Sequence, residues 1–392
     1  MEVYMIEIFE GAISGFTTYK EEMSCCIKTL GHNLHVIILD APINDLCIER
    51  SPKQETIKIP QIQRRETLGC ILSLYIQDTR ETVFIHNFAV SFPVLSLLKS
   101  YFPQSKLVYV IHDFIWASYL MGDVNLFKDL INHKKYVNEY DEIVAFYEDG
   151  LKSFNLVDKT VCLSMDTYKL LRDFYRIAHN RIAYVPNGLR DASIPKYASN
   201  NLRESMRLTE RDKVFLYVGR LTKQKGIYCL LEAFELLCKE YPNAYLAIAG
   251  DLGSNFVVRT SNSILRKVML LGRVRKQELY KWYCAADFGV IPSFYEQCSY
   301  TGIETKMFSL PSVVSDAFGV KCMFNATNSI MIQLHDNIDC VYSLYNGLKQ
   351  AMNMHDGDIE RLKNNARENY EKEYSFEQMC LNYKERLFDL LK

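Results

Sequence analysis

Short apolar segments alternate with longer segments of helical periodicity along most of this chain of 392 residues. Runs such as Val3–Ile8, Leu34–Leu39 and Leu107–Ile111 have the length of buried strands, and segments such as Phe16–Leu30 separate them. The alternation favours parallel sheets covered by helices, because neighbouring parallel strands need a long crossover between them. We therefore predict an α/β fold.

The strand series is interrupted between residues 191 and 212, where the sequence is polar and has no clear period. Before this segment, Tyr184–Gly188 ends a strand in a Pro-Asn-Gly turn. After it, Val214–Val218 begins a second series. The chain also exceeds the length at which one core usually stops growing. We expect an inter-domain linker here and predict domains at residues 1–190 and 191–374, with a terminal amphipathic helix at 375–392.

Charge and composition exclude several classes of function. The 46 basic and 47 acidic side chains nearly balance, which argues against a nucleic-acid partner. No apolar run approaches the roughly 18 residues of a membrane span, and Met1–Gly11 lacks the basic start and cleavage site of a secretory signal. We therefore expect a cytoplasmic protein, and peripheral contact with a membrane stays open. Its twelve cysteines include no CxxC pair, so we expect reduced thiols.

The strongest candidate site is the segment EQCSYTGIE, from Glu296 to Glu304, which follows a strand ending at Pro292. Ser299 is a suitable N-cap, and the free N–H groups at a helix start attract anions. Tyr300 and Glu304 lie one turn apart on one face of the predicted helix. The alternative is that Glu296 and Glu304 are only solvated side chains. A strand, a loop and a capped helix in this order favour a ligand site.

Three further segments lie at predicted strand ends. Arg220 and Lys225 follow the first strand of the second half, at the edge where open α/β sheets bind ligands, and they suit a diphosphate. The loop Gly11–Gly15 has two glycines but not the dinucleotide-binding spacing, and Asp40 keeps a dehydrogenase alternative open. His112 ends a strand of the first half, where a structural role and a role in a cleft are both open.

The sequence indicates no metal site and no cofactor. Asp356 and Asp358 have the spacing of a carboxylate pair, but they precede a predicted helix and most simply cap it. His32 and His35 have no further ligand at metal-binding spacing.

Together these segments resemble the retaining, nucleotide-sugar-dependent glycosyltransferases of family four. Val185–Gly188 is similar to the turn that joins the family's domains, and Tyr217–Gly226 to its diphosphate loop. Gly272–Val274 resembles the stretch that lines its base pocket, and Glu296–Glu304 its E-x7-E signature. The resemblance implies the GT-B fold, in which two Rossmann-like domains face across a cleft and a C-terminal helix crosses back to the first domain.

The resemblance also implies roles for single residues. Glu304 is expected to hold the donor ribose, Arg220 and Lys225 to neutralise the diphosphate, and Glu296 and His112 to act beside the reacting sugar. The other implied donor-binding residues are Gly15, Val274, Ser299, Tyr300 and Thr301. Transfer is expected to need no metal, to use a UDP- or GDP-linked sugar, and to act on a glycan, lipid-linked or peptide acceptor.

Two segments depart from the family pattern. Gln297–Tyr300 stands where many members have Gly-Phe-Gly, and Ala317–Cys322 replaces the usual Gly-Gly…Glu loop. Both changes lie near the expected sugar or phosphate, so the donor sugar stays undecided. Alternative functions on the same architecture are a sugar-nucleotide epimerase, a phosphorylase and a non-catalytic sugar-nucleotide sensor.

Overall fold

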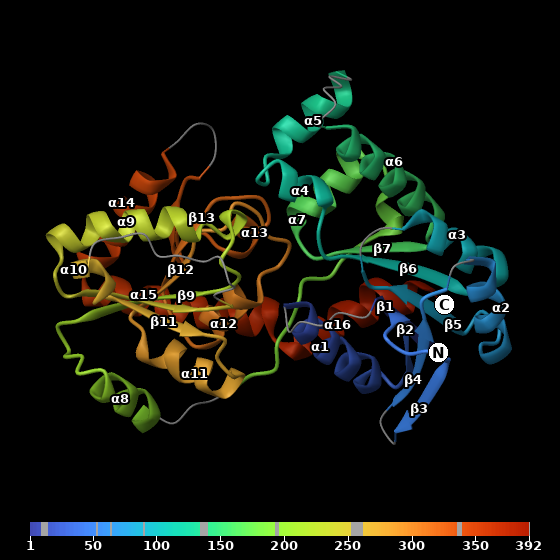
Figure 1. Cartoon of the computed structure of the whole chain (residues 1–392), viewed down its shortest axis with the longest axis horizontal. Helices are drawn as coiled ribbons and strands as arrows, with labels where there is room; N and C mark the ends of the chain where they lie inside the picture. The colour runs from blue at the N-terminus through green and yellow to red at the C-terminus, as the bar shows by residue number, and fades with distance from the viewer. Residues whose placement is uncertain are drawn as a thin grey trace. The chain divides into compact units, whose positions relative to one another are not determined.

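The computed structural model describes residues 1–8, 15–51, 54–62, 65–88, 91–133, 140–192, 196–251, 262–334 and 339–391. The chain forms two compact units. The first comprises Met1–Leu120, Val124–Gly188 and Phe376–Lys392, and the second comprises Met121–Asp123 and Leu189–Ser375. Each unit contains one sheet with helices on both faces (Figure 1), which confirms the predicted α/β class.

The first unit is built on an eight-stranded sheet with the order β3-β4-β2-β1-β5-β6-β7-β8, in which only the edge strand β3 is antiparallel to its neighbour. Its strands are β1 (Glu2–Ile8), β2 (Asn33–Ala41), β3 (Cys47–Ser51), β4 (Gln54–Pro60), β5 (Thr82–His86), β6 (Lys106–Ile111), β7 (Lys159–Cys162) and β8 (Ile182–Tyr184). Its helices are α1 (Gly15–Thr29), α2 (Arg65–Tyr75), α3 (Phe92–Tyr101), α4 (Ile115–Tyr119), α5 (Val124–His133), α6 (Asp141–Leu156), α7 (Met165–Lys169), α16 (Phe376–Tyr383) and α17 (Asp389–Leu391). The central strands are apolar because both faces of the sheet are covered.

The terminal helix α16 is part of the first unit. Its residues Met379 and Tyr383 are buried, and the Tyr383 hydroxyl lies 2.9 Å from the Tyr19 hydroxyl of α1. Met379 Sδ accepts a hydrogen bond from the Gly188 N–H at 3.2 Å. The units therefore meet in sequence at residues 188/189 and 375/376, where the sequence analysis placed boundaries at 190/191 and 374/375.

The second unit has a wholly parallel six-stranded sheet with the order β11-β10-β9-β12-β13-β14. Its strands are β9 (Lys213–Val218), β10 (Ala244–Ala249), β11 (Val268–Gly272), β12 (Phe288–Ile291), β13 (Ser312–Ser315) and β14 (Ile330–Ile332). Its helices are α8 (Lys196–Ser205), α9 (Ile227–Glu240), α10 (Asn262–Leu265), α11 (Lys276–Ala285), α12 (Tyr300–Met307), α13 (Val320–Met323), α14 (Cys340–Met352) and α15 (Asp356–Asn369). The strand order reverses between β9 and β12, and such a switch point is where open α/β sheets bind ligands.

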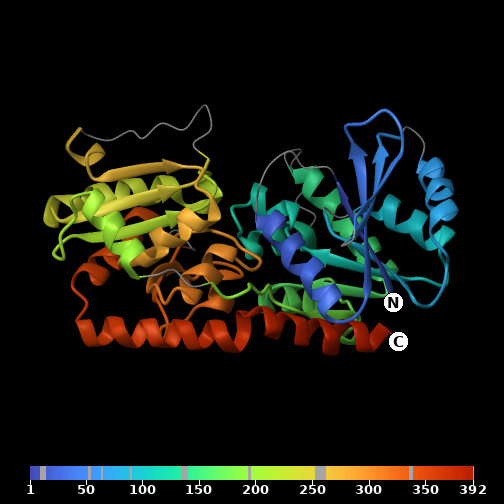
Figure 2. The same ribbon diagram turned by 90° about the horizontal axis from the view of Figure 1, so that it is seen from below.

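Helices α9 and α14 cover one face of this sheet, and α11 and α12 lie on the other (Figure 1). Leu230, Phe234 and Leu348 are fully buried between α9, α14 and the strands. On the second face, α15, red in Figure 2, packs against α12.

The polar segment at residues 191–212 is not only a linker, because α8 forms within it. Arg203 of α8 donates to the carbonyl of Ala285 at 2.9 Å and to the Asp287 carboxylate at 3.0 Å. Ala285 is the last residue of α11 and Asp287 immediately precedes β12, so these bonds hold α8 on the second unit. The helix propensity of this polar segment does not predict α8, because tertiary contacts override a weak local pattern.

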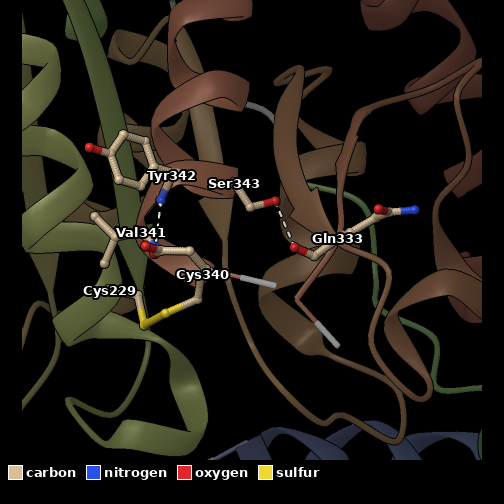
Figure 3. The surroundings of a disulfide bond; sticks show 7 residues. Cys229, Gln333, Cys340, Val341, Tyr342 and Ser343 are labelled. Atoms are coloured by element: carbon tan, nitrogen blue, oxygen red, sulfur yellow. Dashed lines mark hydrogen bonds between the residues drawn. A yellow bond between two sulfur atoms is a disulfide. The ribbon is translucent and has the colours of Figure 1, made fainter. Parts of the chain in front are cut away.

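The expectation of reduced thiols throughout is wrong for one pair of cysteines. Cys229 and Cys340 form a disulfide that joins the first turns of α9 and α14 (Figure 3). Next to it, Asp339 caps α14, and the Ser343 hydroxyl donates to the Gln333 carbonyl at 2.6 Å. The two cysteines are 111 positions apart, so only the packing of α9 against α14 brings them together.

The carboxylates and histidines that the sequence analysis considered for a metal site have structural contacts instead. Asp356 and Asp358 lie in the first turn of α15, whose N-cap is His355, so they do not cap it themselves. His35 lies between the carboxylates of Glu2 and Glu55. The described residues contain no group of three or more side chains suited to a metal, and none of their helices is long and apolar enough to cross a bilayer.

Candidate active site

The E-x7-E segment connects β12 to α12 in the way that the sequence predicts. Ser299 is the N-cap of α12, and its hydroxyl accepts a hydrogen bond from the Gly302 N–H at 3.3 Å. The Ser299 N–H in turn donates to Met323 Sδ at 3.2 Å. Thr301, in the first turn, donates to the carbonyl of Val218 at 3.2 Å, so the start of α12 lies at the carboxyl end of β9.

Lys225 and Glu296 form an ion pair at the same edge of the sheet. Lys225 Nζ lies 2.6 Å from Glu296 Oε1, and both side chains are mostly buried, with 18% and 13% exposed. The Ser293 hydroxyl donates to the same carboxylate oxygen at 2.9 Å. The sequence analysis assigned this cation to a diphosphate and this carboxylate to a sugar. In the structure the two neutralise each other.

Gly226 allows the two loops to meet. Its φ of 71° lies in the left-handed region, and a Cβ at this position would lie 2.0 Å from the Pro292 carbonyl oxygen. The Phe294 N–H also donates to the Gln224 carbonyl at 2.9 Å. A side chain at residue 226 would therefore push apart the loops that carry Lys225 and Glu296.

Arg220 lies in the loop after β9, five positions before Lys225. Its side chain is exposed, and its carbonyl accepts a hydrogen bond from the Tyr217 hydroxyl at 2.6 Å. The buried tyrosine therefore fixes the backbone of the loop, while the guanidinium stays accessible. Val274 follows β11 at the carboxyl end of the same sheet and is half-buried, as is Tyr300.

Glu304 is a buried carboxylate on α12. Its Oε2 accepts a hydrogen bond from the Tyr283 hydroxyl at 2.7 Å. Burial raises the pKa of Glu304 to about 7, although the hydrogen bond from Tyr283 and the charge of Lys276 both favour the ionised form. The Tyr283 ring stacks on Phe308 with centroids 5.6 Å apart. A ligand that donates hydrogen bonds to this carboxylate would stabilise its charged form.

His112 follows β6 in the first unit. Its Nε2 lies 2.6 Å from Asn87 Oδ1, and its ring contacts Phe16 and Tyr19 edge-on. Burial lowers the pKa of His112, so the imidazole is neutral at neutral pH. Gly15 is the first residue of α1, and the rest of its glycine loop, residues 11–14, lies outside the described residues.

Comparisons with known proteins match this chain to glycosyltransferases. Residues 198–368 match the family model for glycosyl transferases group 1, and this range includes Arg220, Lys225, Glu296 and Glu304. Chains of glycosyltransferase fold match along the whole sequence, among them sucrose-phosphate synthase from Thermosynechococcus elongatus, with a TM-score of 0.72, 16% identity and 98% of each chain covered. The chain is similar to glycosyltransferases of the family-four type.

Other relatives support the same assignment. Alpha-monoglucosyldiacylglycerol synthase of Acholeplasma laidlawii is 28% identical over 79% of this chain and 78% of its own length. Anabaena HepE, solved in complex with UDP and glucose, has a TM-score of 0.70 at 13% identity and covers 99% of this chain and 100% of its own. An uncharacterized glycosyltransferase of Methanocaldococcus jannaschii is 28% identical over 54% of this chain. This chain spans 58% of that relative, and 46% and 37% of two others. The structural neighbours confirm the predicted GT-B type of fold.

The loop Ala317–Cys322, which departs from the family pattern, packs against the residues just before the other departing segment, Gln297–Tyr300. The Glu296 N–H donates to the Phe318 carbonyl at 3.1 Å, and the Tyr295 ring stacks on Phe318 at 5.4 Å. Gly319, with a φ of 78°, lies where a Cβ would be 1.8 Å from the Glu296 carbonyl oxygen. The loop Ala317–Cys322 therefore supports the backbone of Glu296 directly.

The sequence analysis did not predict which side chains hold the candidate residues. These partners are Tyr283, Ser293 and Asn87. The position of Ser293 could have indicated its role, because it directly follows a strand and lies three positions before Glu296. Asn87 also ends a strand, β5. Tyr283 gives no local signal, because its contact with Glu304 joins two helices 21 positions apart.

Proposed function

We propose that this glycosyltransferase moves a sugar from a nucleotide-diphosphate donor to an acceptor hydroxyl, with retention of the anomeric configuration and without a metal. The observation that carries the proposal is the set of groups at the carboxyl edge of the second sheet. Lys225 and Glu296 form a pair there, the capped start of α12 lies beside β9, and Glu304 is a buried acceptor.

The chemistry of such a transfer requires stabilisation of a departing diphosphate. Arg220, Lys225 and the N-terminus of α12 supply fixed positive charge or partial charge, which is most effective where negative charge develops. In the structure, Glu296 neutralises Lys225. We infer that the diphosphate takes over Lys225 and that the released Glu296 carboxylate accepts hydrogen bonds from the sugar. This exchange avoids an unpaired, half-buried charge in either state.

The remaining assignments follow the same logic. Glu304 accepts hydrogen bonds from the ribose hydroxyls, and the neutral His112 exchanges hydrogen bonds with the sugar rather than adding charge. UDP is the first nucleotide to test, because the names of several relatives and structural neighbours include it. A GDP-linked donor is the second. For the acceptor, we propose a glycan or a lipid-linked molecule, as in the names of a lipopolysaccharide transferase and a glucolipid synthase among the relatives.

The function is tested first by donor screening. Among UDP, GDP, ADP and their sugars, one donor should raise the melting temperature and be hydrolysed slowly by the purified protein. Turnover should continue in excess EDTA, and NMR of fresh product should show the anomeric configuration of the donor. Loss of turnover in EDTA with recovery on adding a divalent ion would contradict metal independence, and an inverted product would contradict retention.

Arg220→Ala and Lys225→Ala should each lower kcat by about 100–1,000-fold, because removing one donor that stabilises transition-state charge costs ~2.7–4 kcal/mol. Lys225→Arg should not restore full turnover, since the two cations differ in shape. The matched control is Lys223→Ala, an exposed lysine in the same turn. Wild-type turnover in both alanine variants would show that this loop is only solvated.

A further inference from the structure

Lys306 is a fully buried lysine in the second unit, two residues after Glu304 on α12. Its Nζ donates hydrogen bonds to the Met323 carbonyl and to Asn369 Oδ1. The rings of Phe324 and Tyr374 lie 4.3 and 4.5 Å from the same nitrogen. Among the described residues, no carboxylate forms an ion pair with it. Carbonyl oxygens and ring faces therefore replace water around this amine.

Keeping a lysine at this position is costly. Burial lowers the pKa of Lys306 to about 7, because the interior disfavours the charged form. A methionine has a similar length and would fill the same space without that cost. The contacts of Lys306 show which segments the amine holds in place.

Lys306 holds α13 against the start of α12. Met323 contacts α12 twice, because its carbonyl accepts from Lys306 and its Sδ accepts from the Ser299 N–H at 3.2 Å. A Cβ on Gly302 would lie 3.1 Å from Met323 Cε and 3.0 Å from the Phe324 ring. The segment Met323–Phe324 therefore lies directly along the first turn of α12.

Lys306 also holds the segment Asn369–Tyr374, which begins at the last residue of α15. The Tyr374 carbonyl accepts from the Leu189 N–H at 3.0 Å, where the chain enters the second unit. Arg367 adds a bond from its guanidinium to the Met307 carbonyl at 2.8 Å. The helix that carries Ser299 and Glu304 is thus fixed between two segments distant in sequence, and Lys306 contacts both.

We propose that Lys306 is a positioning residue for the donor site: by bonding Met323 and Asn369 it sets where α12 presents Ser299 and Glu304 to a nucleoside diphosphate. The inference rests on the function proposed above. Without the amine, the Met323 carbonyl and Asn369 Oδ1 lose a buried donor, and α12 is free to shift between its neighbours. A shift of about 1 Å in a positioned site can cost on the order of 100-fold in rate.

The test compares Lys306→Met, Lys306→Arg and the control Lys239→Met, which replaces an exposed lysine on α9. Calorimetry with UDP, GDP and ADP gives the Kd well below each melting temperature, and steady-state kinetics give kcat and KM for the active donor. Lys306→Met should keep its melting temperature but raise the Kd of the bound nucleotide about 10-fold or more and lower kcat/KM. Lys306→Arg should recover part of the affinity, and Lys239→Met should match the wild type.

Each outcome decides a different point. If the wild type binds none of the three nucleotides, the proposed function fails. If the wild type binds one and folded Lys306→Met binds it with the same Kd, the positioning role is overturned. Should Lys306→Met not fold, Asn369→Ala, which removes one of the two hydrogen-bond acceptors, decides: an unchanged Kd in that variant overturns the role, and a several-fold rise supports it.

Discussion

Glu304→Ala should weaken binding of the donor nucleotide by at least 100-fold while the protein stays folded. The carboxylate is proposed to accept two hydrogen bonds from the ribose, and bonds to a charged group are worth about 1.5–3 kcal/mol each. Calorimetry of the variant and the wild type with the same nucleotide sugar measures the loss. Tyr283→Phe, which removes the hydrogen bond at 2.7 Å but keeps the aromatic ring, should have a smaller effect in the same direction.

The same site makes donor affinity depend on pH. Burial raises the pKa of Glu304 to about 7, and the hydrogen bond from Tyr283 and the charge of Lys276 oppose this rise. Because ribose hydroxyls bind the ionised carboxylate, affinity should rise as the pH rises through 7, and binding should release a proton. Below that pH, the loss should approach tenfold per pH unit. Glu304→Gln should remove this dependence and leave only the ligand's own titration. A pH dependence that is the same in both proteins would contradict the role of Glu304.

Glu304 also has a defined effect on stability. Its folded pKa of about 7 lies above the unfolded value of 4.5, so the folded protein binds more protons between these values. The linkage relation then gives a contribution to the free energy of unfolding that falls as the pH rises from about 4.5 to 7.

Reduction of the Cys229–Cys340 disulfide should lower the free energy of unfolding of the second unit by up to about 4.7 kcal/mol. This value applies to a closed loop of about 100 residues in the chain-entropy model, and the two cysteines are 111 positions apart. Urea unfolding with and without a phosphine reductant measures the difference. The double variant Cys229→Ser/Cys340→Ser should behave as the reduced wild type and should not respond to reductant.

The control for this experiment is Cys70→Ser, which changes an exposed free cysteine of the first unit. This variant should show the same difference in the free energy of unfolding between the oxidised and reduced protein as the wild type. An unfolding midpoint of the wild type that does not change with reductant would mean that the cross-link contributes nothing to stability.

The sequence predicted those features that depend on local order along the chain. Strand ends, the cap at Ser299 and the position of Lys225 after the first strand of the second half follow from apolar periodicity and turn residues. It did not predict pairings across the fold. Lys225 with Glu296, Tyr283 with Glu304, and Cys229 with Cys340 all come from different elements. Their geometry depends on the strand order β9-β12 and on helix packing, which residue patterns leave open.

Lys306 illustrates this limit most clearly. Glu304, two residues earlier, belongs to a recognisable motif, whereas nothing in the sequence distinguishes Lys306 from the other lysines. A helical pattern assigns a lysine to the solvated face by default. The packing of Phe324 and Tyr374 around its amine, which the sequence does not reveal, makes this position interior.

The composition of the first unit also constrains how the protein is made. Phe376–Lys392 belongs to the unit that begins at Met1, and Tyr383 bonds to Tyr19, whose ring contacts His112. A chain leaves the ribosome from its N-terminus, and domains generally fold as units. The unit that is synthesised first must therefore wait for Phe376–Lys392 before its core is complete, whereas nearly all of the second unit has by then emerged. Removal of Phe376–Lys392 should consequently disturb the surroundings of His112, although Tyr383 and His112 are 271 positions apart in the sequence.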